Sequence, residues 1–186
     1  EGDRITDRIV GILGSKEFDS IVIGPGMGKS QESIIAVQAI IDNFENIVID
    51  ADAIVPYDFK NKNILLTPHM GELSRLEVKS EQKDLMNFAN SNNLTVLLKG
   101  KKDLITDGHY FKINMTGHPR MSVGGTGDVL AGFCGGLMGK GLSAFEAARL
   151  GAYSLGKAGE LCYEEFGAGF LPTDLATCVS KVIRKN

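Results

Sequence analysis

The chain has 186 residues, enough for one sizeable hydrophobic core and too few for two comfortable domains. Its net charge of −3, with the lysines and arginines scattered, argues against a nucleic-acid-binding protein. The sequence has no apolar run of membrane-spanning length and no signal-peptide pattern, so we expect no membrane partner and a cytoplasmic location.

Short apolar runs alternate with helical patterns through the first half of the chain. The predicted strands span 19–24, 46–50, 63–67 and 94–98. Helices are expected after Ser30, over 71–78 and after Ser80, with the two serines as N-caps. Continuous apolar strands separated by helices indicate a parallel sheet that is covered on both faces.

The second half of the chain begins with a different pattern. Two strands, 103–106 and 110–113, flank an Asp-Gly turn and predict an antiparallel hairpin. Helices are then expected at 126–138, 144–165 and 172–184. No linker or repeat divides the sequence, so we expect residues 1–186 to form a single α/β domain.

Each of the first four predicted strands ends in a glycine-rich or polar motif. These motifs are Gly-Pro-Gly-Met-Gly at 24–28, Asp-Ala-Asp at 50–52, Thr-Pro-His-Met-Gly-Glu at 67–72 and Lys-Gly-Lys-Lys-Asp at 99–103. Ligands of open α/β sheets bind at the carboxyl ends of the strands. The motifs are therefore predicted to meet in space, although they are far apart in the sequence.

Three of these motifs have a functional and a local interpretation. The loop 24–28 either approaches a ligand or is a plain turn. Asp50 and Asp52 either bind a ribose hydroxyl or hydrated cation, or serve as turn and cap residues. His69 and Glu72 either bind a polar ligand and a cation, or form a capping box at the start of a helix.

The segment 123–132, Val-Gly-Gly-Thr-Gly-Asp-Val-Leu-Ala-Gly, places three glycines and a carboxylate ahead of an apolar helical run. Glycines allow close approach to a phosphate, and the unpaired N–H groups of a helix start attract its charge. Asp128 is suitably placed to take a proton from a hydroxyl beside that phosphate. Alternatively, the segment is a turn with an N-cap. Lys99 is a second candidate for a nucleotide phosphate.

The segment 124–132 resembles the anion-hole segment of the ribokinase-like superfamily. The ordered motifs at 24–28, 50–52, 67–72 and 98–100 narrow the match, and the chain resembles the ATP/ADP-dependent NAD(P)H-hydrate dehydratases. The resemblance implies a ribokinase-like, three-layer α/β/α fold with a mostly parallel sheet and a small antiparallel hairpin. It also implies repair of hydrated NAD(P)H, NAD(P)HX, through transient phosphorylation of the ring hydroxyl.

The resemblance further implies roles for individual residues. Asp128 is the expected base, and the N–H groups of Gly125, Thr126 and Gly127 are the expected donors to the transferring phosphoryl group. The expected contacts of the hydrate are Gly26 or Gly28, His69 and Asp128. The expected contacts of the ATP or ADP are Lys99, Gly100, Lys101, Lys102, Asp103 and Gly127. Mg²⁺ is expected on the nucleotide, and Glu72 is the candidate protein ligand.

The match differs from the family pattern in two places. Met70 stands where the family commonly has proline, which changes loop stiffness and not chemistry. The family's domain also begins well upstream of its Gly-Pro-Gly segment, so the first strands and helices are expected to be missing from 1–186. A fragment, a cleaved precursor or a second polypeptide that supplies these strands would each account for this, and a homo-oligomer is expected.

Two other functions remain open at this stage. A ribokinase-like kinase of a small vitamin precursor or sugar would share the segment 124–132 and Asp128. A non-catalytic nucleotide-binding protein would also retain this segment. The Thr-Pro-His-x-Gly-Glu motif at 67–72 favours the dehydratase.

Overall fold

The computed structural model describes residues 8–14, 17–59 and 62–184 and contains one six-stranded sheet. The strands are β1 (Ile21–Ile23), β2 (Asn46–Ile49), β3 (Asn63–Leu66), β4 (Thr95–Leu98), β5 (Asp103–Thr106) and β6 (Phe111–Asn114). They lie in the order of the sequence. The first four are parallel, whereas β5 and β6 are antiparallel to their neighbours. The predicted mostly parallel sheet with a hairpin is confirmed.

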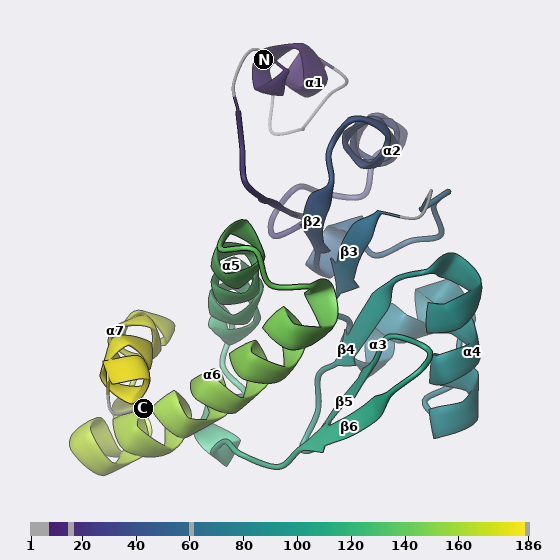
Figure 1. Cartoon of the computed structure of the whole chain (residues 1–186). Helices are drawn as coiled ribbons and strands as arrows, with labels where there is room; N and C mark the ends of the chain where they lie inside the picture. Colours follow the sequence, from purple (N-terminus) through teal and green to yellow (C-terminus); the bar gives the residue numbers. More distant parts are fainter. Residues whose placement is uncertain (1–7, 15–16, 60–61, 185–186) are drawn as a thin grey trace.

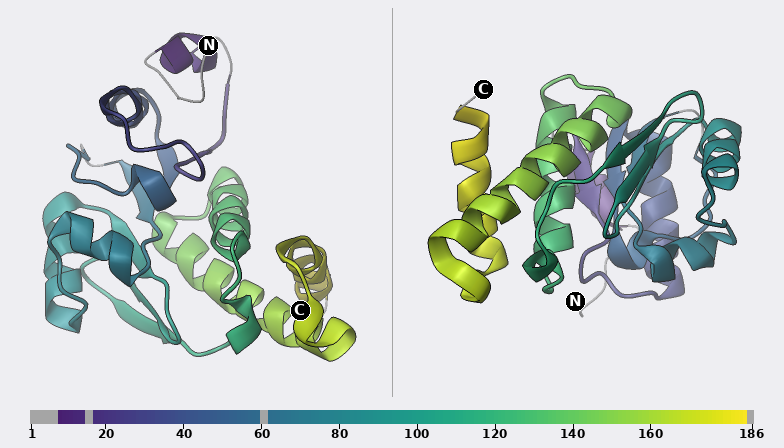
Figure 2. Two further views of the ribbon diagram at one scale, coloured as in Figure 1. Left: turned by 180° about the vertical axis from the view of Figure 1, so that it is seen from behind. Right: turned by 90° about the horizontal axis from the view of Figure 1, so that it is seen from below.

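Helices cover both faces of this sheet (Figures 1 and 2). One face carries α2 (Gln31–Asn43), α3 (Met70–Leu73) and α4 (Gln82–Asn92), with α1 (Arg8–Leu13) packed mainly on α2. The other carries α5 (Thr126–Gly139) and α6 (Ala144–Phe166), with α7 (Pro172–Arg184) packed mainly on α6. Short 3-10 turns occur at Ala51–Ala53, Ser74–Leu76, Pro119–Met121 and Gly167–Gly169. The three-layer architecture expected from the sequence is confirmed.

Alternation along the buried strands divides the core into two hydrophobic clusters. On β2, Ile47 and Ile49 pack toward α2 and α4, whereas Val48 packs toward α5 and α6. All three are completely buried, as expected for a strand in the interior of a parallel sheet. The apolar runs that predicted these strands therefore reflect coverage by helices on both sides.

Two local predictions need correction. Ser80 does not cap α4, because Glu81 occupies the N-cap position and makes no side-chain capping bond. The helix expected over 71–78 is shorter and breaks into α3 and a 3-10 turn, which ends at Glu77 with φ of 56°. In contrast, Ser30 caps α2 as predicted and accepts a hydrogen bond from the Ser33 backbone N–H at 3.2 Å.

Glycine allows α5 to lie directly against the edge strand β1. A Cβ on Gly135 would collide with Cγ2 of Val22, and one on Gly139 would lie 3.2 Å from Oγ of Ser20. The Ser20 hydroxyl donates to the Gly135 carbonyl oxygen at 2.7 Å. These contacts orient α5 so that its N-terminus reaches the carboxyl ends of the parallel strands. In the described part of the chain, no helix is long and apolar enough to cross a membrane.

Candidate active site

The carboxyl ends of β2, β3 and β4 meet at a buried ion pair. The Lys99 ammonium, which follows β4, lies 2.6 Å from Oδ1 of Asp50, which follows β2. The Thr67 hydroxyl, which follows β3, donates to the same oxygen at 2.8 Å. Three motifs that are separate in the sequence therefore meet at the predicted edge of the sheet.

This cluster is largely shielded from solvent. The side chain of Asp50 is 1% exposed and that of Lys99 is 19% exposed. The buried carboxylate needs a paired cation and a hydrogen-bond donor to offset its lost hydration, and Lys99 and Thr67 supply both. A second carboxylate, that of Glu72, lies farther away, with its Oε2 3.8 Å from the Lys99 ammonium.

His69 and Glu72 form the capping box that was one of the two sequence interpretations. The Glu72 backbone N–H donates to Nδ1 of His69 at 3.1 Å, and the His69 backbone N–H donates to Oε2 of Glu72 at 2.8 Å. Because Nδ1 accepts, Nε2 carries the proton of the neutral ring, and it lies 3.2 Å from Oε1 of Glu72. The His69 side chain is nevertheless 56% exposed, so its ring remains accessible to a ligand.

The start of α5 lies beside the Lys99–Asp50 pair. A Cβ on Gly127 would be 3.3 Å from the Lys99 ammonium nitrogen and 3.9 Å from Oδ2 of Asp50. Gly125 is the N-cap with φ of 95°, and no side chain caps this helix. The first-turn N–H groups of a helix have no partner within it, so the turn directs positive potential outward.

Asp128 is exposed in this first turn, as a base that meets a substrate requires. The Thr126 backbone N–H donates to the Val123 carbonyl oxygen at 3.3 Å, so one of the three expected donors already has an acceptor in the turn. The Thr126 hydroxyl is enclosed and has no hydrogen-bond partner among the described residues. Gly125 packs against α7, where its Cβ would lie 3.1 Å from Cγ of Pro172.

The glycine loop that follows β1 packs against the residues that follow β2. Gly24 has φ of 127°, and a Cβ there would collide with the Asp50 carbonyl oxygen. Gly26 and Gly28 are exposed, have φ of 68° and 74°, and leave open space where a side chain would be. The Gly28 N–H donates to Oδ2 of Asp52 at 3.2 Å. The loop therefore presents bare backbone at the same edge of the sheet.

The loop after β4 is only partly directed to the site. Lys101 and Lys102 are exposed. Oδ1 of Asp103 accepts the Gly100 N–H at 3.1 Å, and Oδ2 accepts from the Asn114 side chain at 2.9 Å. Burial raises the pKa of the Asp103 carboxyl group above its usual range, while these hydrogen bonds oppose the rise. The Asp103 side chain thus organises the loop and anchors β6.

Glu72, the expected ligand of the magnesium ion on the nucleotide, already interacts with His69 through both of its carboxylate oxygens. In the described ranges, no three His, Cys, Asp or Glu side chains are grouped to hold a metal ion. Mg²⁺ commonly binds one or two carboxylates together with substrate phosphates and water. Glu72 stays the candidate carboxylate because its side chain is 7% exposed, whereas that of Asp50 is 1% exposed and paired with Lys99.

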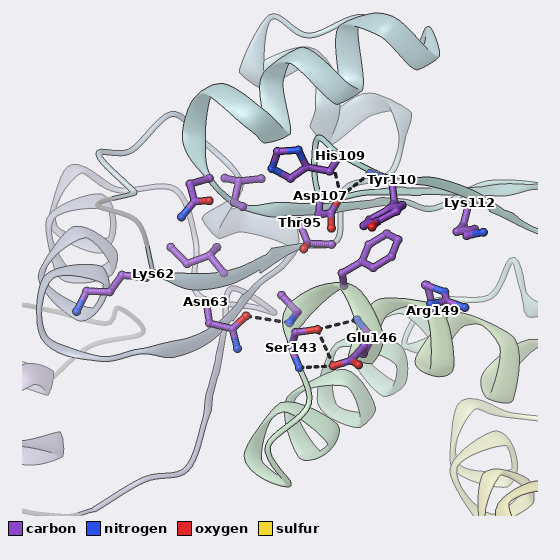
Figure 3. A pocket seen from close by; sticks show the side chains of 15 residues that line it. Lys62, Asn63, Thr95, Asp107, His109, Tyr110, Lys112, Ser143, Glu146 and Arg149 are labelled. Carbon is purple, nitrogen blue, oxygen red and sulfur yellow. Dashed lines mark hydrogen bonds between the residues drawn. The ribbon is translucent and has the colours of Figure 1, made fainter.

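A cavity of about 740 Å³ lies at the opposite end of the sheet (Figure 3). It adjoins Asn63 and Thr95, the first residues of β3 and β4, and the start of α6. Figure 3 shows the turn before β6 facing Ser143, Glu146 and Arg149 of the α6 region. This cavity is therefore separate from the strand ends that carry Asp50 and Lys99.

A sequence model of the NAD(P)H-hydrate dehydratase family matches residues 3–181. The chain belongs to this family. It is 40% identical over 190 residues to a bifunctional NAD(P)H-hydrate repair enzyme of Methanospirillum hungatei, covering 98% of this chain and 39% of that protein. It is 36% identical over 179 residues to an ADP-dependent (S)-NAD(P)H-hydrate dehydratase of Cenarchaeum symbiosum, covering 90% and 62%.

Solved structures agree with this assignment. The ADP/ATP-dependent NAD(P)H-hydrate dehydratase of Bacillus subtilis, co-crystallised with ATP and Mg²⁺, superposes with a TM-score of 0.81 at 26% identity. That match covers 91% of this chain and 66% of the Bacillus protein. A ribokinase of Thermotoga maritima, with a TM-score of 0.60 at 14% identity, shows the shared ribokinase-like fold alone. The family and fold implied by the sequence motifs are confirmed, and the chain spans less than two thirds of these dehydratases.

Proposed function

We propose that this chain carries a nucleotide-dependent dehydratase activity that returns hydrated NADH or NADPH to the intact cofactor. Membership of the dehydratase family supports this substrate. The observation that carries the proposal is the exposed carboxylate of Asp128 in the uncapped first turn of α5, the turn whose Gly127 lies beside the Lys99 ammonium. An exposed carboxylate close to a positive electrostatic field is what phosphoryl transfer to a hydroxyl requires, and this supports the proposal.

The proposed reaction has two steps. The terminal phosphoryl group of ATP or ADP is transferred to the hydroxyl oxygen of the hydrated nicotinamide ring, and the hydroxyl proton passes to Asp128. The C–O bond then breaks, and phosphate leaves with the bonding electron pair. Loss of a proton from the adjacent ring carbon restores the double bond of NAD(P)H. Phosphorylation is needed because hydroxide is a poor leaving group.

The remaining residues bind and orient the reactants in this proposal. The N–H groups at Gly125 and Gly127 and the Lys99 ammonium face the transferring phosphoryl group, and the Thr126 N–H shares this role with its bond to the Val123 carbonyl oxygen. Gly26, Gly28 and His69 contact the hydrate, and the loop from Lys99 through Gly100, Lys101, Lys102 and Asp103 borders the nucleotide. Glu72 is the candidate residue that would hold an Mg²⁺ ion arriving with the nucleotide, and this ion would neutralise the developing negative charge.

The deciding experiment incubates the protein with hydrated NADH and either ATP or ADP. We expect recovery of the absorbance of the reduced nicotinamide ring, with release of inorganic phosphate in equal amount. Hydrated NADPH and the two nucleotides, compared in parallel, define the preferred pair. Phosphorylation of a vitamin alcohol or sugar without recovery of that absorbance would instead establish the kinase function, and nucleotide binding without any turnover would establish a binding protein.

We also propose that the protein acts in the cytoplasm as a homo-oligomer. Cys134, Cys162 and Cys178 are buried free thiols, which suits a reducing compartment. Large hydrophobic side chains are exposed on neighbouring surfaces of β6 and α6, among them Ile113 at 54% and Leu150 at 44%. Light scattering after size-exclusion chromatography tests the oligomeric state, and fractionation of the source cells tests the location.

A further inference from the structure

The ion pair at the candidate active site joins two strands that are not neighbours in the sheet. Asp50 follows β2 and Lys99 follows β4, so the pair spans the end of β3. Thr67, at the end of that middle strand, donates to the oxygen that Lys99 contacts. One oxygen of the Asp50 carboxylate, Oδ1, is therefore held by two donors, which defines the orientation of the group.

The ammonium of this pair lies beneath the first turn of α5. Its nitrogen would be 3.3 Å from a Cβ on Gly127, so only a glycine leaves this space free at that position. A positive charge beside a helix N-terminus is repelled by the positive end of the helix dipole. Without a counter-charge the flexible lysine side chain would move away, and Asp50 supplies that counter-charge at 2.6 Å.

The same ammonium has donor capacity for a ligand. An ammonium carries three N–H donors. Asp50 accepts one of them at 2.6 Å, and the nearer oxygen of Glu72, at 3.8 Å, is beyond hydrogen-bonding distance. The Lys99 side chain is 19% exposed, so the residue is not completely closed off from a ligand at this edge of the sheet.

We propose that Asp50 is a positioning residue for phosphoryl transfer, which holds the Lys99 ammonium beneath the first turn of α5 to meet the phosphoryl group of the nucleotide. This inference rests on the proposed function, because it assumes that the nucleotide binds at this turn. Asp50 acts through Lys99 and does not contact the reactants.

A double-mutant cycle tests this proposal. Lys99→Met should lower kcat by about 10²-fold, a typical loss for one electrostatic donor. Asp50→Asn alone should lower kcat at least about 10-fold, whereas the same change in the Lys99→Met background should alter kcat less than about 2-fold, as expected for two residues that act as one unit. Independent, multiplicative losses from the two substitutions would overturn the proposal.

Stability is controlled separately, because loss of one partner of a buried ion pair destabilises a protein. Thr67→Val is a milder variant that removes only the hydroxyl that orients the Asp50 carboxylate, and its loss of kcat should also disappear in the Lys99→Met background. Lys62→Met is the matched control, since Lys62 is likewise 19% exposed and 2.6 Å from a carboxylate oxygen, that of Glu45. It should leave kcat unchanged. Thermal unfolding and the stoichiometry of bound nucleotide give the folded fraction of each variant.

Nucleotide affinity separates failure of this proposal from failure of the proposed function. If the parent protein binds ATP or ADP but does not dehydrate the hydrate, the proposed reaction is wrong, and the same cycle is measured by calorimetric titration of the nucleotide. Dependence of the Asp50→Asn effect on Lys99 then supports the positioning role at a nucleotide site. Independence of the two affinity changes, or no binding by the parent, overturns it.

Discussion

Gly127→Ala is a direct test of the contact between α5 and Lys99. The added Cβ would lie 3.3 Å from the ammonium nitrogen and 3.9 Å from Oδ2 of Asp50, which is tight enough to displace the ammonium by a few tenths of an ångström. We expect kcat to fall by about 10- to 100-fold, since small displacements of catalytic groups have large effects on the rate. The free energy of unfolding should change little, because alanine favours a helix by about 1 kcal/mol over glycine and offsets the crowding.

The assay compares this variant with Gly136→Ala in the same helix. Gly136 is exposed and a Cβ there would meet nothing within 4 Å, so the control gains helix propensity without a new contact. It should retain full activity and gain about 0.5–1 kcal/mol in urea unfolding. Equal activity of the two variants, with both folded, would refute the argument that the Lys99 ammonium packs against the start of α5.

Three further predictions concern other parts of the chain. Asp128→Asn should reduce turnover by at least about 10³-fold while the dissociation constant of the nucleotide stays within about 3-fold; normal turnover in the phosphate-release assay would exclude Asp128 as the base. Gly135→Ala should destabilise the fold by about 1–3 kcal/mol through collision with Val22, as measured by urea unfolding, and an unchanged midpoint would contradict this packing. Burial, assisted by the nearby negative charge of Asp50, raises the pKa of the Cys134 thiol to about 12, so this thiol stays protonated well above neutral pH. A thiolate-specific reagent should therefore leave Cys134 unmodified at pH 8 in the folded protein and modify it in urea, and rapid modification of the folded protein would disprove its burial.

The sheet was predictable because its strands carry strong local signals. Val48, Leu65 and Leu97 lie in continuous apolar runs, and these runs are completely buried between two layers of helices. The N-cap residue of α4 was harder to predict. Both Ser80 and Glu81 precede the helix, and the choice between them depends on where the chain turns toward α4.

The sequence predicted which motifs meet at the candidate site, but not which of their side chains pair with one another. Parallel strands bring their carboxyl ends to one edge, which correctly grouped Asp50, Thr67 and Lys99. Lys99 pairs with Asp50 across the end of β3. This pairing depends on the side-chain rotamers and on how far each residue lies beyond the end of its strand, and the spacing of residues in the sequence encodes neither. The capping box of His69 and Glu72 was accessible from sequence because its interactions are local.

The strand order has a consequence for how the two cores are completed during synthesis. Every strand pairs with the strand next to it in the sequence, so the sheet can grow in the order in which the chain emerges from the ribosome. Its α2–α4 face is covered as it grows, because those helices lie between the strands. Val48, Leu65, Leu97 and Ile105 on the opposite face remain uncovered until α5 and α6 follow the last strand. A ribosome that stalls between β6 and α5 would therefore hold a sheet with one apolar face open to chaperones or to aggregation.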